Sequence, residues 1–169
     1  MPEITKRIDI DSSVSEVWDV LASFESISEW ADNVSHSCLL SDQLKGVGTF
    51  RRIQSGNSSV TEHVTKWEEL RHLSYEIKGL PSVLKQVLNT WSLEPSEIGV
   101  QLSLTIEIIP IRRPFTPIAG LACLVFGRIN TGMLKDLKRF IEDEKPLMKL
   151  EKKISLLEQR IEDLESRND

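Results

Sequence analysis

One acidic side chain is a candidate for chemistry because it interrupts an apolar face. Residues 60–64 (VTEHV) alternate as a β-strand does, and the alternation places Glu62 on the same face as the two valines. Glu62 therefore points into the protein, or a β-bulge breaks the alternation. Because a buried carboxylate without a partner costs several kcal/mol, we expect an ion pair with Arg51 or Arg52 on the preceding strand-like segment.

The sequence leaves two interpretations of Glu62 open. The pair with arginine is purely structural, or Glu62 serves as an acid, a base or a polar anchor for the head group of a ligand. Tyr75 is the second candidate for acid–base chemistry. Tyr75, Asn89 and Trp91 fall on the apolar faces of their strands if the alternation holds. Aromatic side chains with polar tips line pockets well, but they also fill cores.

No stronger catalytic signature accompanies these residues. Residues 46–48 (GVG) lack the third glycine and the following helix of a dinucleotide site, and the motifs of serine hydrolases and zinc proteases are missing from the sequence. The three histidines, His36, His63 and His72, are too scattered to predict a metal centre. We therefore expect neither a metal ion nor a cofactor.

Helices and strands, which differ in the spacing of their apolar residues, must position these side chains. After a short strand-like run, Ser13 and Glu16 form a capping box that predicts a helix, and a second short helix follows as far as Trp30. From residue 34 to residue 109 the apolar period becomes two, and turn residues divide the segment into about six strands. The clearest strand is the last, with Leu102, Leu104, Ile106 and Ile108 on its covered face.

A long helix is predicted after Pro110 and Pro114. Apolar residues recur at helical spacing from Ile118 to Ile141, which is long enough to cross the covered face of the sheet. The first half of this helix is apolar nearly all round, whereas charged residues occupy one side of the second half. Either loops bury the surplus apolar surface, or residues 118–126 form the rim or gate of a cavity.

The segment after Pro146 has a different repeat. Apolar residues follow one another at alternating spacings of three and four, which predicts a coiled-coil seam. The seam residues are Leu147, Leu150, Ile154, Leu157, Ile161 and Leu164. In a parallel homodimer Lys153 would face Glu158 of the partner chain, and Arg160 would face Glu165, so both pairs have opposite signs.

The same stripe could instead fold back on its own domain or fray, because three heptads are few. The acidic residues 142–144 precede it, which argues against a DNA-binding zipper. We therefore predict a domain over residues 1–145 and a dimerisation helix over residues 146–169.

The composition is that of one globular domain with an appendage. The 169 residues are 40% hydrophobic, and the net charge of -5 offers no attraction to nucleic acid. The first residues lack the apolar core of a secretory signal, and the longest apolar run, residues 118–127, is about half of the ~20 residues that cross a bilayer. We expect a cytoplasmic protein without a transmembrane segment, in which Cys38 and Cys123 are buried free thiols.

The order of strand, two short helices, meander and long helix resembles the START-like or Bet v 1-like (SRPBCC) superfamily, in its bacterial polyketide cyclase/dehydrase and lipid-transport branch. The similarity covers about residues 4–143. It rests on residues 17–21 (VWDVL), Trp30, residues 46–51 (GVGTFR), 62–64 (EHV), 73–75 (LSY) and 134–137 (LKDL). The resemblance implies an α+β helix-grip fold, in which a curved antiparallel sheet of about seven strands wraps around the long helix and encloses a cavity for a hydrophobic molecule.

The implied cavity residues come from the short helices, the strands and the long helix. They are Trp30, Arg51, Glu62, Tyr75, Asn89, Trp91, Leu104, Ile106, Leu121 and Val125. Three functions remain open. The favoured one is binding or transport of a lipid or polyketide-like molecule; the alternatives are a polyketide cyclase or dehydratase that uses Glu62 or Tyr75, and a ligand-responsive interaction module.

Overall fold

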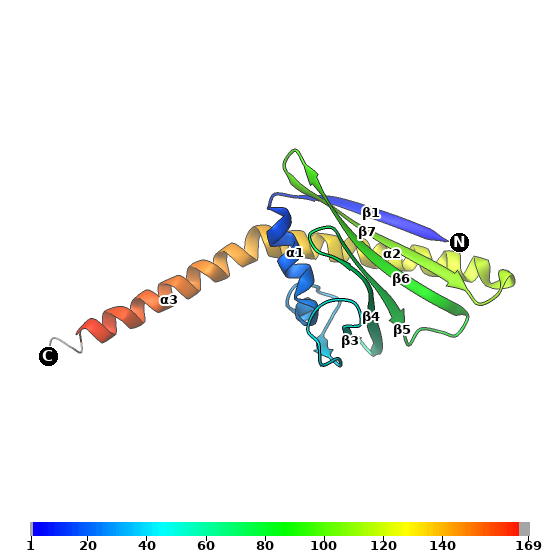
Figure 1. Cartoon of the computed structure of the whole chain (residues 1–169), viewed down its shortest axis with the longest axis horizontal. Coiled ribbons are helices and arrows are strands. Elements are labelled where there is room, and N and C mark those ends of the chain that lie inside the picture. The colour runs from blue at the N-terminus through cyan, green and yellow to red at the C-terminus, as the bar shows by residue number, and fades with distance from the viewer. Residues whose placement is uncertain (1, 166–169) are drawn as a thin grey trace.

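The computed structural model describes residues 2–165 and shows an α+β fold built on one curved sheet (Figure 1). Seven antiparallel strands lie in the order β1-β7-β6-β5-β4-β3-β2. The strands are β1 (Glu3–Ile10), β2 (His36–Leu39), β3 (Phe50–Ser55), β4 (Ser58–Glu68), β5 (His72–Lys78), β6 (Leu84–Ser96) and β7 (Gly99–Pro110). The fold class and the six-stranded meander predicted from the sequence are confirmed.

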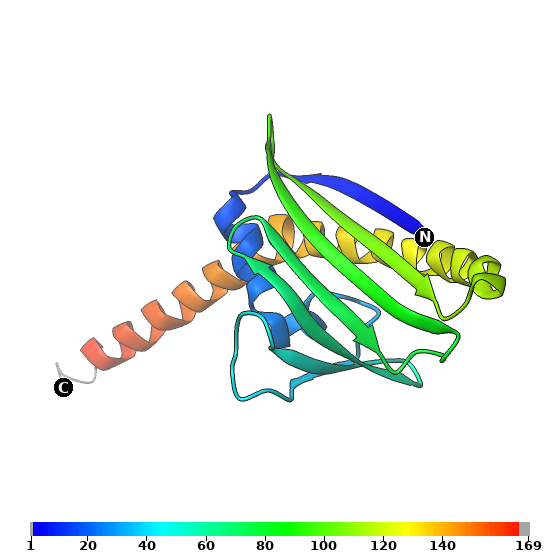
Figure 2. The ribbon, with the colours of Figure 1, turned by 45° about the vertical axis from the view of Figure 1, so that its right-hand side comes forward.

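The helices occupy one side of this sheet and then leave it. The long helix α2 (Thr116–Arg139) lies across the face of the sheet in both views (Figure 1, Figure 2). The other helical elements are α1 (Val14–Ala22), the 3-10 turns η1 (Phe24–Glu29) and η2 (Arg113–Phe115), the π-helical turn η3 (Phe140–Glu144) and α3 (Lys145–Glu165).

The sheet is a simple meander to which the N-terminal strand is added at the far end. Strands β2 to β7 pair in chain order, and β1 then pairs antiparallel with β7, with Ile4 opposite Ile106. Helix α2 packs against β1 and β7. The two ends of the domain's chain therefore meet at the same edge of the sheet.

Period-two alternation and helical spacing together produce the core. All four apolar residues predicted for the covered face of β7, Leu104 and Ile106 among them, are fully buried. From α2, Ala119 and Leu137 are fully buried and Cys123 is 2% exposed. Leu104 and Ile106 therefore belong to a packed core and not to a cavity wall, which corrects their predicted role.

The first half of α2 keeps much of its apolar surface in contact with solvent. Leu121 is 65% exposed and Val125 is 52% exposed, and neither lines the pocket described below. The expectation that these two residues line the cavity is therefore corrected. The reason is their position on the side of α2 opposite the buried Ala119 and Cys123, which periodicity cannot distinguish when a helix is apolar all round.

Local signals in the sequence were accurate at the first helix and less so at the cysteines. The Ser13 side chain accepts a hydrogen bond from the backbone N–H of Glu16 at 3.2 Å, as the capping box predicted. Cys123 is buried, but Cys38 is exposed, because β2 is the edge strand of the sheet. The prediction of a buried Cys38 was wrong.

Helix α3 extends away from the domain (Figure 1). It continues α2 through the π-helical turn η3, and it does not lie back on the sheet (Figure 2). The described seam residues are 47–60% exposed: Leu147, Leu150, Ile154, Leu157 and Ile161. The side chain of Leu164 lies outside the described part of the structure.

Candidate ligand-binding site

The site is organised around an ion pair between two neighbouring strands. Arg51 on β3 lies directly opposite Glu62 on β4 in the strand register, and both side chains point to the covered face. The Nε and Nη2 atoms of Arg51 donate to the same Glu62 oxygen, Oε2, at 2.8 and 2.6 Å. The predicted partner of Glu62 is therefore confirmed as Arg51, while Arg52 points outward and bonds to Ser59.

The short helix η1 covers this ion pair. The Nη1 atom of Arg51 donates to the backbone carbonyl of Phe24, and the guanidinium lies 3.8 Å from the centre of the Phe24 ring. Phe24 in turn makes an edge contact with Tyr75 at 5.8 Å. The side chains of Arg51 and Glu62 are each 4% exposed, so the charge of the carboxylate is balanced by arginine and not by water.

A chain of amide groups runs from the strands to α2. Asn130 on α2 donates from Nδ2 to Oδ1 of Asn89 at 3.2 Å, and Asn89 donates to the Tyr75 hydroxyl at 3.3 Å. Asn130 is 1% exposed, and its Oδ1 atom has no hydrogen-bond partner within the described residues. A buried polar atom without a partner costs about 1–3 kcal/mol, so its presence calls for an explanation.

A pocket of about 290 Å³ lies between α2 and strands β3 to β6, beside this amide chain. Its wall is largely apolar, and Ile53, Val60, Ile77, Phe126 and Met133 contribute to it. Its most buried polar members are Glu62, Asn89 and Asn130. Its rim is formed by exposed residues that include Asn33, Ser55 and Ile129. The pocket is therefore polar at its inner end and apolar along its wall.

Arg51 and the large aromatic residues predicted for the cavity lie outside this pocket. Trp30, Arg51, Tyr75 and Trp91 surround a neighbouring void of about 10 Å³, which is room for about one water molecule. Burial, and to a smaller degree the charge of Glu62, raise the pKa of Tyr75 well above its usual value. Tyr75 therefore stays protonated and has no access to the 290 Å³ pocket, which removes it from the candidates for a catalytic base.

Glu62 and Asn89 are the two predicted cavity residues that line the pocket, and Asn130 is a further polar residue of the lining that was not predicted. Asn130 lies in a helix whose apolar periodicity dominates the pattern. A signal was present: Asn130 occupies the position four residues after Phe126, on the face that must be buried. A polar residue at such a core position calls for a partner.

The family assignment follows from a direct match along most of the chain. The family described as polyketide cyclase / dehydrase and lipid transport matches residues 1–142. The chain belongs to this family. No curated protein matches the sequence.

Solved structures support the same fold at low sequence identity. The chain is similar to the XoxI protein of Bacillus cereus, with a TM-score of 0.69, 19% identity, and coverage of 86% of this chain and 99% of that one. It is also similar to Ara h 8.0201 (TM-score 0.66, 12% identity, 82% and 96% covered). A further similar structure is the di-domain ARO/CYC StfQ from the steffimycin biosynthetic pathway (TM-score 0.68, 14% identity, 85% and 52% covered).

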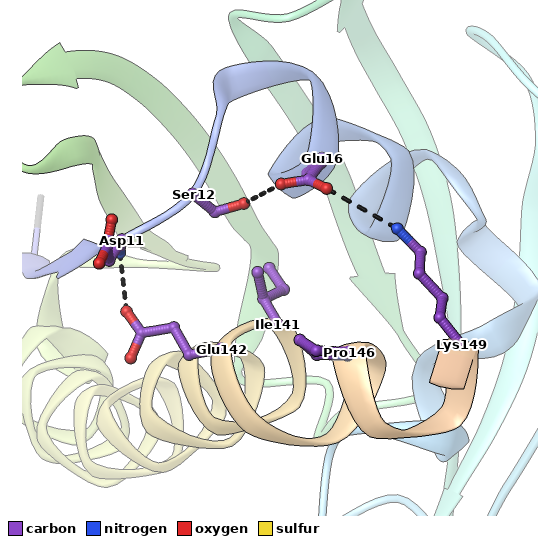
Figure 3. A pocket seen from close by; sticks show the side chains of 7 residues that line it. All are labelled: Asp11, Ser12, Glu16, Ile141, Glu142, Pro146 and Lys149. Atoms are coloured by element: carbon purple, nitrogen blue, oxygen red, sulfur yellow. Dashed lines mark hydrogen bonds and ion pairs between the residues drawn. The ribbon is translucent and has the colours of Figure 1, made fainter. Parts of the chain in front are cut away.

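This member of the family has a second hollow, of about 260 Å³, where α3 leaves the domain (Figure 3). Glu142 accepts a hydrogen bond from the backbone N–H of Asp11 at 2.7 Å, and the Ser12 hydroxyl donates to Glu16 at 2.6 Å. Lys149 on α3 lies 3.8 Å from the Glu16 carboxylate. These contacts tie the base of α3 to the turn between β1 and α1.

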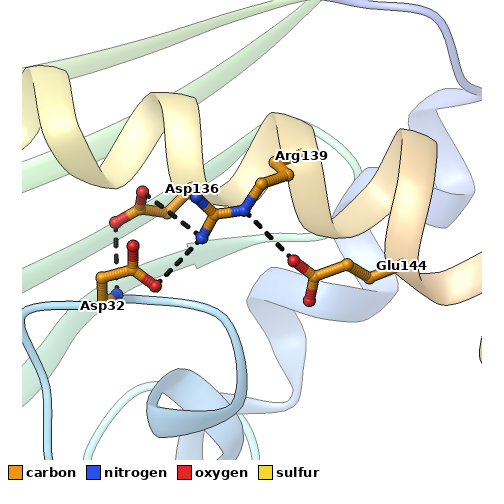
Figure 4. Close-up of polar contacts among 4 residues, drawn as sticks. All are labelled: Asp32, Asp136, Arg139 and Glu144. Atoms are coloured by element: carbon orange, nitrogen blue, oxygen red, sulfur yellow. Dashed lines mark hydrogen bonds and ion pairs between the residues drawn. The ribbon is translucent and has the colours of Figure 1, made fainter.

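A second polar cluster holds the end of α2 (Figure 4). Arg139 lies 2.9 Å from Asp32, 3.1 Å from Glu144 and 3.8 Å from Asp136. Asp136 also accepts from the backbone N–H of Asp32 at 3.2 Å. Because Asp32 directly precedes Asn33 at the pocket rim, one loop contacts both the 290 Å³ pocket and the C-terminal end of α2.

Within residues 2–165, no group of three His, Cys, Asp or Glu side chains is placed to hold a metal ion.

The described residues contain one apolar helix of membrane-spanning length. By length and composition alone, the continuous helix Thr116–Ile161 contains a segment apolar enough to cross a bilayer. About a third of that segment is buried against the domain.

Proposed function

We propose that this protein binds a small apolar molecule that carries a hydroxyl group, and that the 290 Å³ pocket between α2 and strands β3 to β6 is its binding site. The proposal rests on one observation above all. The pocket has an apolar wall, yet its inner end contains the buried Asn130 with an unpaired amide atom. Membership of a family that includes lipid transport supports a small hydrophobic ligand.

The hydroxyl group follows from the hydrogen bonds at the inner end. A hydroxyl both donates and accepts, so it can pair with the free atom of Asn130 whichever way the amide is turned. Both guanidinium bonds of Arg51 end on Oε2 of Glu62, and no described hydrogen bond reaches Oε1. The carboxylate therefore offers a second acceptor to the same ligand group.

Binding, and not turnover, is the function that this geometry favours. Catalysis of a proton transfer commonly pairs an acid with a base. Among the described residues that line the pocket, Glu62 is the one titratable side chain and Arg51 balances its charge, while Tyr75 is sealed from the pocket. We place the protein in the cytoplasm, where its two thiols stay free.

The pocket can be tested with two probes that differ by one hydroxyl group. We expect naphthol to bind the wild-type protein about tenfold more tightly than naphthalene, because naphthalene leaves the buried polar atoms unpaired. The Asn130→Leu variant should lose most of this preference while it retains naphthalene, as measured by fluorescence titration. The exposed Asn57→Leu variant, in the turn after β3, is the matched control and should bind both probes as the wild type does.

Equal affinity of the wild-type protein for the two probes would refute the proposal that polar atoms at the inner end bind a hydroxyl group of the ligand. Native mass spectrometry of protein purified from its own source gives an independent readout. We expect a co-purified molecule with at least one hydroxyl group. If the protein binds neither naphthol nor naphthalene and no molecule co-purifies with it, the pocket is not a binding site.

We further propose that α3 forms a parallel coiled coil with a second copy of the chain. The support is the exposed seam of five described apolar residues on a helix that extends clear of its own domain. The charges also fit, because Lys153 would lie opposite Glu158 of the partner.

The assembly is tested by exchanging these charges in the full-length protein. Glu158→Lys should weaken the dimer by placing two lysines opposite each other, and the double variant Lys153→Glu/Glu158→Lys should restore it. Sedimentation equilibrium measures the association constant. A wild-type protein that remains monomeric at micromolar concentration would refute the dimer. An equal loss of association in the single and the double variant would also refute it.

A further inference from the structure

The outer face of α2 has five large apolar side chains that no described element covers. Its members lie three or four residues apart, so they form one stripe on the helix surface. They are Ile118 (48% exposed), Leu121 (65%), Leu124 (61%), Val125 (52%) and Ile129 (38%). Neither of the two explanations suggested by the sequence, burial under loops or the rim or gate of a cavity, accounts for the outermost of these side chains. We call this stripe the α2 outer face.

The charged residues on the chain segment that carries the α2 outer face have one sign as far as Lys135. Residues 109–135 contain Arg112, Arg113, Arg128 and Lys135 and no acidic residue, although the whole chain has a net charge of -5. Arg128 follows Leu124 by four residues and Val125 by three, so it lies on the same face, and it is exposed. An exposed apolar stripe with cations beside it is the combination that lies on anionic lipid.

The α2 outer face also continues into the pocket. Ile129 belongs to both, since it is partly exposed and lines the pocket rim, and Phe126 of the pocket wall directly follows Val125 of the stripe. A surface that covers the stripe would therefore also cover the entrance beside Ile129. In a contact between two copies through this face, both copies would contribute the same cations, which disfavours self-association there.

We propose that the α2 outer face docks on the surface of an anionic lipid bilayer, so that the pocket entrance faces the membrane from which an apolar ligand enters. This inference rests on the proposed binding function and adds the source of the ligand. Helix α2 lies along the membrane surface and does not span it, because its inner side, with Ala119, Cys123 and the buried Asn130, remains packed on the sheet. The cations Arg128 and Lys135 contact lipid head groups, and Leu121 and Val125 enter the acyl region.

The experiment is co-sedimentation of the full-length protein with vesicles. One set contains phosphatidylcholine alone, and in the other about a third of the lipid is phosphatidylserine. We expect clear preference for the anionic vesicles and a decrease in binding with added salt. The Leu121→Glu/Val125→Glu variant should bind at least tenfold less, and Arg128→Gln should bind anionic vesicles about fivefold less while binding to phosphatidylcholine is unchanged.

The Ile98→Glu variant is the matched control. Ile98 is 57% exposed in the turn between β6 and β7, away from α2, so the same apolar-to-acidic change there should leave vesicle binding unaltered. Docking on lipid is overturned if the wild type does not bind anionic vesicles, or if the α2 and Ile98 variants behave alike. It is also overturned if the Leu121→Glu/Val125→Glu variant dissociates an oligomer in sedimentation equilibrium without lipid, because a second copy then covers the face.

Naphthol titration of the same variants separates this inference from the proposed function. The affected residues, Leu121, Val125 and Arg128, do not line the pocket, so naphthol affinity should stay at the wild-type value in each variant. Vesicle binding that fails while naphthol binding persists overturns the docking alone. Naphthol binding that fails while the vesicles still bind overturns the ligand site alone.

Discussion

Replacing Arg51 by methionine tests whether the buried ion pair is a structural element. The substitution keeps most of the side-chain volume and removes the charge, so Glu62 loses both of its hydrogen bonds, at 2.8 and 2.6 Å. The carboxylate is then left 4% exposed without a partner. A broken buried pair costs about 3–5 kcal/mol, because the remaining charge is not compensated. For a chain of this length, that corresponds to a decrease in Tm of about 6–20 °C.

The double variant Arg51→Met/Glu62→Leu is the decisive comparison. It removes both charges and fills the space with apolar groups, a change that is often neutral or stabilising. We therefore expect its free energy of unfolding to lie within about 1 kcal/mol of the wild-type value, well above that of Arg51→Met. The exposed pair of Lys66 and Glu68 supplies the control, since Lys66→Met should cost less than about 1 kcal/mol.

Urea unfolding followed by tryptophan fluorescence measures all these variants, and the protein contains four tryptophans. A typical stability of about 5–15 kcal/mol leaves Arg51→Met folded enough to measure. A loss below about 1 kcal/mol in Arg51→Met would refute the reasoning. Glu62 would then be solvated through the pocket, and the ion pair would not be what stabilises it.

Three further predictions concern thiols, pH and a turn. Cys38 should react rapidly with a thiol reagent while Cys123 reacts only on unfolding, because burial both shields the Cys123 thiol and raises its pKa; equal rates in a colorimetric thiol assay would contradict the packing of α2. Burial, with the nearby charge of Asp32, raises the pKa of Asp136 above its usual value of 3.8. The native state therefore binds a proton at Asp136 more tightly than the unfolded state does. For this reason the contribution of Asp136 to the free energy of unfolding falls as the pH rises from 3.8 through the native pKa. Asp136→Asn should therefore have a higher Tm than the wild type at neutral pH, and the advantage should vanish below pH 3.8; a constant difference across pH would disprove the linkage. Gly99→Ala should lower Tm by several degrees, because φ is +141° and the added Cβ would overlap the carbonyl oxygen of Ile10; an unchanged Tm would show that the turn relaxes.

The fold was predictable because its elements follow from local patterns. Alternation in β7 identifies its buried face without reference to any other part of the chain, and Ser13 marks the start of α1 through a contact with Glu16 only three residues away. The inward direction of Glu62 was predictable in the same way, since the apolar residues on either side of it in β4 fix the face.

The composition of the site was less predictable, because it depends on how distant elements meet. The pocket joins β4 and β6 to α2, and the contact between Asn89 and Asn130 spans 41 residues. Tyr75 and Trp91 have the same alternation as Asn89, yet they surround a void of about 10 Å³ instead of the pocket. Their separation depends on the curvature of the sheet and on the position of η1, which no local pattern specifies.

By itself the sequence determined which residues form strands and helices, which face of each strand is apolar, and that Glu62 needs a cation, since each of these depends on neighbours along the chain. The tertiary structure alone decided that Arg51 and not Arg52 supplies that cation, that Asn130 completes the polar end of the pocket, and that Leu121 and Val125 face outward. Side-chain period tells which residues share a face, but only the packing of α2 against β1 and β7 determines which of two apolar faces is covered.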